Sequence, residues 1–348
     1  MNQTYLSWLA AETNTRWNND SAIHSQAEAA CAQGAIGVTT NPPLSYEALM
    51  TDTNLYGENL SRLDKNLPDD EFAFQAMCLV VKHFSGYFRD LHEKKGGFYG
   101  GVRAQVAPNL RANAQAMFDY GKRLAAVGKN ILVKIPGTKA GISVLEELAA
   151  LGINTNPTVI VSVSQALATA EAFERGRDRA VRAGLPAPVS TCAVVMGRLQ
   201  DYFAVLNKER NLGLAMADLE WAALAVVKRS YAIYREKGFH SRIMPAAFRA
   251  PVQVEQIAGG EFWATIHPKI QAAVEEADRA GSMRRNIFAD APVDEGAVKR
   301  VAAALPEFSV ACEPDGLTVD EFDAFGGVVM TLDGFHEGWK QLVSLKYT

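Results

Sequence analysis

Short β-like runs alternate with longer helix-like segments along the 348-residue chain, and this alternation restricts the possible folds more than any other feature. The pattern is typical of parallel sheets, because a helix carries the chain back between two parallel strands. Eight such units favour a single closed (β/α)8 barrel, the TIM-barrel architecture of the α/β class, over an open doubly wound sheet. The predicted strands span residues 6–11, 35–40, 101–106, 131–135, 154–160, 191–196, 241–246 and 262–266.

The helix-like segments show the period of amphipathic helices. In residues 141–151, Ile142, Leu145 and Leu148 lie on one face, and Gly152 is placed to end the helix. No GxGxxG motif follows the first predicted strand and the chain contains no GxxxxGK[ST] motif, so nothing favours a nucleotide-binding fold.

Two segments interrupt the regular alternation of strands and helices. The first, at about 44–97, has helical periodicity in part but contains no clear strand. The second, at about 283–348, is irregular and rich in proline before it ends in another helix-like stretch. We expect a helical insertion after strand 2 and a C-terminal extension, both belonging to one barrel domain that spans residues 1–348.

The charge balance excludes several classes of partner. With 35 Lys and Arg against 39 Asp and Glu, the formal net charge is −4, so bulk charge does not attract nucleic acid and any anion must be held by a local site. No run reaches the roughly 18 apolar residues of a membrane span, and the first residues do not resemble a signal peptide. We therefore expect a cytoplasmic protein with no membrane partner.

Cysteine and histidine are scattered, so the sequence predicts no disulfide framework, no metal site and no cofactor. None of them has CxxC or HExxH spacing. The cysteines are Cys31, Cys78, Cys192 and Cys312, and the histidines are His24, His83, His92, His240, His267 and His336.

Lys134 stands inside an apolar, β-branched predicted strand, in the segment Ile-Leu-Val-Lys-Ile-Pro. A lysine buried in a barrel has a lowered pKa, which exposes the lone pair needed to attack a carbonyl group. The alternative is a lysine at a strand end whose ammonium group reaches solvent. The strand alone does not choose between these two interpretations.

Two longer motifs resemble the transaldolase family. Residues 37–42, GVTTNP, resemble its second-strand signature, and residues 133–168, which begin VKIPGTKAGISVLEELAALG, resemble its active-site segment. Further similarity in MGRLQD (196–201) and AFR (247–249) extends along nearly the whole chain in order. The family has the (β/α)8 fold, in agreement with the eight strands counted from the pattern.

The resemblance implies a role for each matching residue. Lys134 is expected to form the Schiff base with a ketose, and Thr158 to hold a water molecule that relays protons. Thr40, Asn41 and Asn156 are expected to bind the substrate. The two asparagines suit this role because amides hold sugar hydroxyls without changing the local charge. In isolation Asn41 would instead be interpreted as a turn residue before a proline.

Arg198 and Arg249 match the family's phosphate-binding arginines, and both follow predicted strands at the end of the barrel where active sites are built. Each alone would more often be a surface residue. Ala247 replaces the serine that usually helps to bind phosphate, and Asn109 stands where an arginine is common. The anion is therefore expected to be phosphate bound differently or another group, such as a sulfonate.

Two catalytic positions also depart from the family pattern. Glu12 is predicted to replace the acid/base aspartate near the end of the first strand. Gln105 stands where transaldolases have the glutamate that positions water, which resembles the fructose-6-phosphate aldolase branch. A glutamine orients water but cannot accept its proton, so Glu12 would carry the proton transfer. The tyrosine of that branch is absent, with Val195 at its position.

The leading hypothesis is a Schiff-base enzyme that transfers a three-carbon dihydroxyacetone unit from a ketose phosphate, such as fructose 6-phosphate or sedoheptulose 7-phosphate, to an aldose. Release of the unit to water would make the enzyme an aldolase, on the same sugars or on another anionic ketose such as a sulfosugar. A third possibility is a non-catalytic protein that binds sugar phosphates. We expect a small anionic sugar as the only partner, and a monomer or a homodimer.

Overall fold

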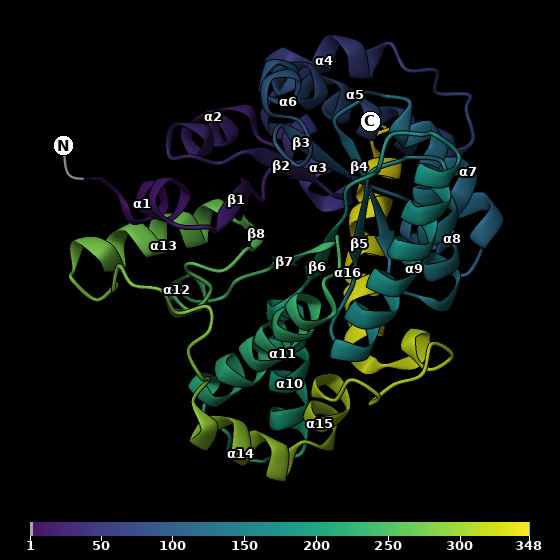
Figure 1. Ribbon diagram of the computed structural model, residues 1–348. Coiled ribbons are helices and arrows are strands. Elements are labelled where there is room, and N and C mark those ends of the chain that lie inside the picture. Colours follow the sequence, from purple (N-terminus) through teal and green to yellow (C-terminus); the bar gives the residue numbers. More distant parts are fainter. Residues whose placement is uncertain (1–2, 348) are drawn as a thin grey trace.

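Eight short parallel strands curl around a common axis in the computed structural model, which describes residues 3–347 (Figure 1). Six of them pair in the order β5-β4-β3-β2-β1-β8, and β6 pairs with β7. Isolated bridges Thr155–Ser190 and Ile160–Val194 join β5 to β6, and β7 lies beside β8. The strands are β1 Arg16–Asn19, β2 Gly37–Thr40, β3 Gly101–Gln105, β4 Ile131–Pro136, β5 Thr155–Thr158, β6 Thr191–Val194, β7 Arg242–Pro245 and β8 Trp263–Ile266. The predicted (β/α)8 barrel is thus confirmed.

Seven of the eight predicted strands overlap observed ones, but the first prediction is wrong. Residues 6–11 lie in helix α1, Tyr5–Glu12, whose N-cap Thr4 accepts a hydrogen bond from the backbone N–H of Ser7. The true first strand has the sequence Arg-Trp-Asn-Asn, in which only Trp17 is apolar. A strand with polar residues facing the barrel interior lacks the apolar pattern by which strands are found.

Alternation along the strands separates an outer apolar face from a polar interior. Val102, Ala104, Ile131 and Val133 belong to an apolar cluster that packs under the surrounding helices. The residues between them, such as Arg103 on β3, point into the barrel, because successive strand residues face opposite sides. The interior therefore contains polar side chains, which is unusual for a barrel core and typical of a site.

Helices cover the outside of the barrel, and polar side chains cap several of them. Thr138 caps the helix after β4 and Ser162 caps the helix after β5, as is usual where a strand leads directly into a helix. Four helices, α3 to α6, occupy the segment between β2 and β3. The helices are α2 His24–Ala32, α3 Pro42–Thr51, α4 Thr53–Ser61, α5 Asp69–Tyr87, α6 Arg89–Lys95, α7 Ala114–Ala125, α8 Lys139–Ala150, α9 Val163–Arg182, α10 Met196–Glu209, α11 Met216–Lys237, α12 Pro251–Glu255, α13 Pro268–Arg279, α14 Glu295–Ala304, α15 Pro306–Cys312 and α16 Gly326–Ser344, with 3-10 turns η1 Pro108–Leu110 and η2 Phe322–Ala324.

The last helix, α16, returns to the barrel and packs against α3 and α5 (Figure 1). Its Gly338 allows this close approach, since a Cβ there would lie 2.4 Å from Cγ of Pro43. Trp339 adds a hydrogen bond from Nε1 to Oδ1 of Asp70, at 2.8 Å. These contacts hold the C-terminal segment over the end of β2, where α3 begins.

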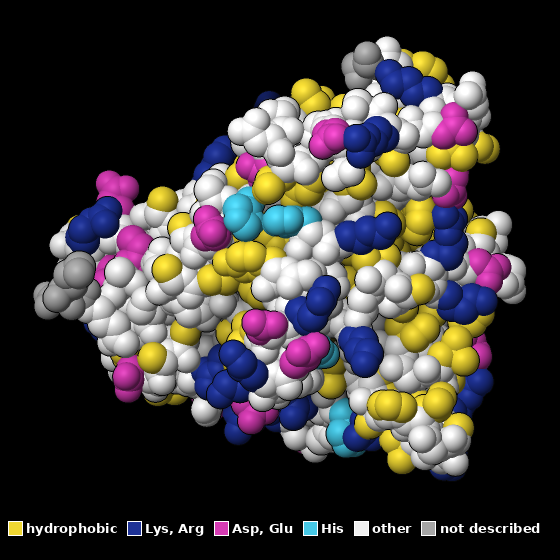
Figure 2. All heavy atoms as spheres, turned by 90° about the horizontal axis from the view of Figure 1, so that it is seen from above, with side chains coloured by type: hydrophobic (Ala, Val, Ile, Leu, Met, Phe, Trp, Pro, Cys, Tyr) yellow, Lys and Arg dark blue, Asp and Glu magenta, His cyan; other side chains and the backbone are white. Residues whose placement is uncertain are grey.

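The surface matches the nearly balanced composition. Figure 2 shows one face on which Lys and Arg side chains are interspersed with Asp and Glu. Among residues 3–347, no helix is long and apolar enough to cross a membrane.

Candidate active site

Strand register brings three of the predicted site residues side by side at the carboxyl end of the barrel. Gln105 on β3 pairs with Lys134 on β4, and Lys134 pairs with Asn156 on β5. Paired residues in a parallel sheet point to the same face, so all three side chains face the interior. The register thus brings together three residues that the family resemblance had singled out separately.

Lys134 is buried, with 5% of its surface exposed. Its amine forms no hydrogen bond with residues 3–347, and Nζ lies 5.9 Å from the ring centre of Phe335. Burial lowers the pKa of Lys134 from 10.5 to about 8, with a smaller lowering by Arg103 and an opposing effect of the Asp20 carboxylate. At neutral pH an appreciable fraction of this amine is therefore unprotonated and able to act as a nucleophile.

Unpartnered oxygen atoms lie around this part of the interior. Oε1 of Gln105, Oδ1 of Asn156 and Oγ1 of Thr158 are buried without a hydrogen-bond partner among the described residues. The amide nitrogen of Asn156 donates to the carbonyl and hydroxyl oxygens of Thr191, which fixes the direction of Oδ1. Buried polar atoms are normally paired, so three free acceptors near one lysine indicate a binding site for a polar ligand or water.

Backbone strain occurs next to two of the predicted site residues. Val159, immediately after Thr158, has φ 61°, and Ala247, two residues before Arg249, has φ 59°. A positive φ is uncommon for residues other than glycine and is a clear outlier for β-branched valine. Such strain gathers at functional sites, where the surrounding structure holds it in place.

Asp20 follows the last residue of β1 and was not among the predicted site residues. Its backbone N–H donates to the carbonyl of Ile266 on β8, and its carboxylate forms no ion pair or hydrogen bond within residues 3–347. It lines the same cavity as Asn41 and Arg198, and its charge acts on the Lys134 amine. Its position one residue after a short polar strand could have identified it, but the first strand was predicted at residues 6–11 instead.

The structure corrects the predicted position of Glu12. This residue is the exposed last residue of α1 and precedes β1, whereas Asp20 follows that strand. Since the chain traverses β1 between them, Glu12 lies at the amino end of the barrel and Asp20 at the carboxyl end. Glu12 is therefore not the carboxylate at the end of the first strand.

Asn41 and Thr40 occupy different environments at the end of β2. Asn41 is the N-cap of α3, where its Oδ1 accepts from the N–H of Leu44 at 3.0 Å, and it also lines the cavity. Thr40 faces away from the interior, and its hydroxyl donates to the carbonyl of Arg103 at 3.1 Å. The prediction that Thr40 contacts substrate is corrected accordingly; Thr39 is the interior residue, paired through its hydroxyl with Thr265.

The cavity that Asp20 and Asn41 line has a volume of about 420 Å³ and carries several cationic side chains. Arg198 forms no hydrogen bond or ion pair among the described residues, and burial lowers its pKa, as does neighbouring Arg249. Arg249 is held by Asp201 through two bonds of 2.6 and 3.0 Å, and donates to the carbonyl of Ala247. Arg198 is thus the arginine that is free to bind an anion.

Several further cavity residues have no counterpart in the sequence predictions, among them His267 and Lys269 after β8, and Phe335 on α16. His267 caps α13, with Nδ1 accepting from the N–H of Lys269 at 3.2 Å. Phe335 is 5% exposed and lines the cavity, and its ring centre lies 5.9 Å from Nζ of Lys134. Only folding of the C-terminal helix onto the barrel brings Phe335 there, so no local signal pointed to it.

Two departures from the family pattern have simple structural roles. Val195 precedes α10 and is 6% exposed, within the apolar core. Asn109 is exposed, and its amide donates to Oδ2 of Asp70 at 2.8 Å. Neither residue lines the cavity that contains Asp20 and Arg198.

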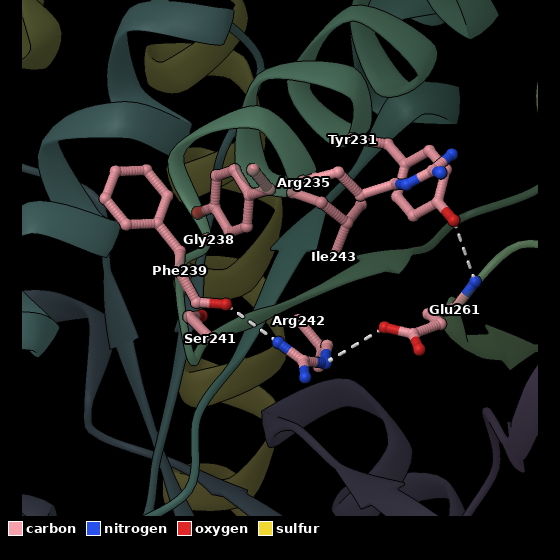
Figure 3. A pocket seen from close by; sticks show the side chains of 9 residues that line it. Tyr231, Arg235, Gly238, Phe239, Ser241, Arg242, Ile243 and Glu261 are labelled. Carbon is pink, nitrogen blue, oxygen red and sulfur yellow. Dashed lines mark hydrogen bonds and ion pairs between the residues drawn. The ribbon is translucent and has the colours of Figure 1, made fainter.

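A second cavity, of about 270 Å³, lies at the other end of the barrel, where β7 begins (Figure 3). Its polar groups already have partners. Arg242 donates to the carbonyl of Phe239 at 2.7 Å and lies 3.6 Å from Glu261, whose backbone N–H donates to the hydroxyl of Tyr231. Barrel active sites occur at the carboxyl end of the strands, so this cavity is not the candidate site.

Comparisons with known proteins identify one matching family. A family model described as "Transaldolase/Fructose-6-phosphate aldolase" matches residues 19–321. The chain is 30% identical over 212 residues to a transaldolase of Thiobacillus denitrificans, covering 58% of each chain, and 35% identical over 155 residues to one of Neisseria meningitidis, covering 44% of each. It is 26% identical over 328 residues to Transaldolase 1 of Streptomyces coelicolor, covering 86% of this chain and 84% of that one. The chain thus matches only about half the length of the first two relatives.

Proposed function

The chain belongs to the transaldolase/fructose-6-phosphate aldolase family, and on this premise we propose that it is a Schiff-base enzyme that transfers a three-carbon dihydroxyacetone unit from a ketose phosphate to an aldose. Family membership supports a function of the transaldolase or aldolase type. The observation that carries the proposal is the buried Lys134 amine, with its pKa lowered to about 8, beside three unpartnered oxygen atoms.

In the proposed reaction, Nζ of Lys134 attacks the C2 carbonyl of the ketose, and loss of water gives an iminium ion. Asp20 then takes the proton of the C4 hydroxyl as the C3–C4 bond breaks and the aldose leaves. The bonding electrons pass into the iminium, which becomes a neutral enamine on Lys134. Attack of this enamine on the aldehyde carbon of an acceptor forms a new C–C bond and restores the iminium, and Asp20 gives its proton to the new alkoxide oxygen. Hydrolysis of the iminium then frees the product and the lysine.

The other residues bind and orient in this proposal. Oδ1 of Asn156 and the amide of Asn41 hold the hydroxyls of the three-carbon unit, and Gln105 with Thr158 holds the water that carries protons to and from Asp20. Support comes from the free acceptors on the strand residues and from the place of Asn41 on the cavity wall. Because these side chains are uncharged, they do not hold the lysine amine in its protonated form.

We assign the tail anion of the sugar first to Arg198, because its guanidinium group has no competing partner among the described residues. Arg249 contributes a second positive charge, and its guanidinium group is bonded to Asp201. A guanidinium group binds either phosphate or sulfonate through paired N–H donors, so both classes of anionic ketose fit this wall.

Gln105 favours a second candidate, an aldolase that releases dihydroxyacetone. An amide at this position holds water next to the enamine without taking its proton, and its Oε1 is buried and unpartnered. Protonation of the enamine, followed by hydrolysis of the iminium, would then compete with attack on an acceptor.

Borohydride reduction tests the proposal. Incubation with fructose 6-phosphate and borohydride should give a stable adduct, which mass spectrometry of peptides assigns to Lys134, and Lys134→Arg should give none. Adding erythrose 4-phosphate separates the activities, because a transaldolase forms sedoheptulose 7-phosphate whereas an aldolase releases dihydroxyacetone. Sugar binding without any adduct would indicate a non-catalytic protein and contradict the proposal.

A further inference from the structure

Arg103 is a buried cation inside the barrel with no anionic partner. Its side chain is fully buried, on β3, two residues before Gln105. Nη1 donates to Oδ1 of Asn18 at 2.8 Å and contacts the carbonyl of Gly101, whereas Nε and Nη2 have no partner among residues 3–347. A charge that is buried and unpaired costs several kcal/mol, so its presence in the core calls for a physical reason.

The strand register fixes where this charge lies relative to Lys134. Arg103 on β3 pairs with Leu132 on β4. Lys134 follows Leu132 by two residues on β4, so its side chain lies on the same face of the sheet. The two cations therefore occupy successive interior layers, separated by about 7 Å along the strands. The guanidinium group extends toward the amino end of the barrel, since Nη1 lies near Gly37 and Gly101, the first residues of their strands.

Arg103 remains charged at neutral pH. Burial lowers its pKa to about 9, and no carboxylate among the described residues acts on it. The charged groups that act on Lys134 are Asp20 from β1, which favours the protonated amine, and Arg103 from β3, which disfavours it. Asp20 lies toward the cavity and Arg103 toward the core, so the two charges act on the amine from different sides.

We propose that Arg103 is a positioning residue of the active site, whose uncompensated positive charge one layer below Lys134 increases the fraction of the lysine amine that is neutral and nucleophilic. This inference rests on the proposed Schiff-base function. A second cation is a known means of activating a buried lysine, because two like charges in a medium of low dielectric constant repel each other. At a separation of ~10 Å and an effective dielectric constant of about 20, the interaction is worth about one pH unit.

The test measures the protonation of Lys134 directly, without a sugar. Lysine amines are reductively methylated with ¹³C-formaldehyde, and NMR titration follows the Lys134 signal, identified by its absence in Lys134→Arg. In Arg103→Met, which keeps an unbranched but shorter side chain and removes the charge, we expect the midpoint to rise by about one pH unit. Arg103→Lys keeps the charge and should stay close to the original midpoint.

Matched controls separate charge from packing. Thr265→Val removes the hydroxyl that pairs with Thr39 in the same interior and leaves every charge in place, so the midpoint should not move. If Arg103→Met does not fold, Arg103→Gln provides the same test, because its amide can still donate to Asn18. An unchanged midpoint in either neutral variant would overturn the proposal and show that the charge of Arg103 is compensated.

The pH profile of adduct formation gives a second readout. The acidic limb of the borohydride-trapping rate should move to higher pH in Arg103→Met by the same amount as the NMR midpoint, with about a tenfold lower rate at pH 7. If the NMR midpoint moves but no variant forms an adduct with any ketose, the proposed function fails and the role of Arg103 stands. If adducts form and neither readout moves, the proposed function stands and the role of Arg103 fails.

Discussion

Replacing Asp20 by asparagine tests which carboxylate transfers the protons. Asparagine has nearly the same shape, so the change removes the charge and the proton acceptor with little disturbance of the fold. A positioned general acid/base contributes about 10²–10⁴-fold to rate, and we expect Asp20→Asn to lower kcat within that range. The loss corresponds to roughly 3–5 kcal/mol of transition-state stabilisation.

The same variant should keep its nucleophile. The Asp20 carboxylate raises the pKa of Lys134, against the lowering by burial, so its removal leaves the amine with a pKa below about 8. The neutral fraction at pH 7, which is about one tenth in the unmodified protein, therefore increases. We expect the lysine to be trapped by substrate and borohydride over a wider range of acidic pH, while complete turnover is lost.

Glu12→Gln provides the matched control, because it removes a carboxylate at the opposite end of β1. Glu12 is exposed, so we expect stability within about 0.5 kcal/mol of the original and no change in kcat. The assay couples formation of the released aldose to a dehydrogenase and compares both variants at several pH values. Turnover within threefold of the original in Asp20→Asn, or a large loss in Glu12→Gln, would refute the assignment of Asp20.

Three other predictions follow from the same site. Lys134→Met should abolish adduct formation and raise the free energy of unfolding at pH 7 by about 3 kcal/mol, measured in urea. The reason is that the pKa of this lysine is lowered from 10.5 to about 8, so its protonated form destabilises the fold below pH 8. This destabilisation is lost as the pH rises toward 10.5. Arg198→Gln should raise KM for a phosphorylated ketose about 10–100-fold, through loss of a charged hydrogen bond, whereas exposed Arg175→Gln should not. Gly197→Ala should destabilise the fold by about 1–3 kcal/mol, because its Cβ would meet the carbonyl of Ala247, and an unchanged melting temperature would contradict this packing.

Local sequence information was sufficient for most of the barrel. Strands 2 to 8 were predicted within a few residues, because their outward-facing residues are apolar and each is followed by a helix with a clear period. Lys134 was singled out by its apolar strand, whereas its role and that of Asn156 came from the family resemblance. The boundaries of a single domain over the whole chain remain a prediction.

The first strand shows where such reasoning fails. Helix α1 contains enough apolar residues to resemble a strand. Strand β1 was not recognised, because its inward residue Asn18 and the following Asp20 are polar. An error of one element moved the expected carboxylate from one end of the barrel to the other, and assigned to Glu12 the place that Asp20 occupies. The motif around Thr40 was found correctly, but only the pleat decided that its side chain faces outward.

The sequence by itself determined the (β/α)8 architecture, the strand that carries Lys134 and the family to which these motifs point, because each depends on residues close together along the chain. Tertiary structure alone decided which groups surround the lysine. Asp20, Arg103, Phe335 and Lys134 come from four separate parts of the sequence, and the strand register and the packing of α16 bring them together. The pKa of the amine depends on burial and on charges across the barrel, which no local pattern records.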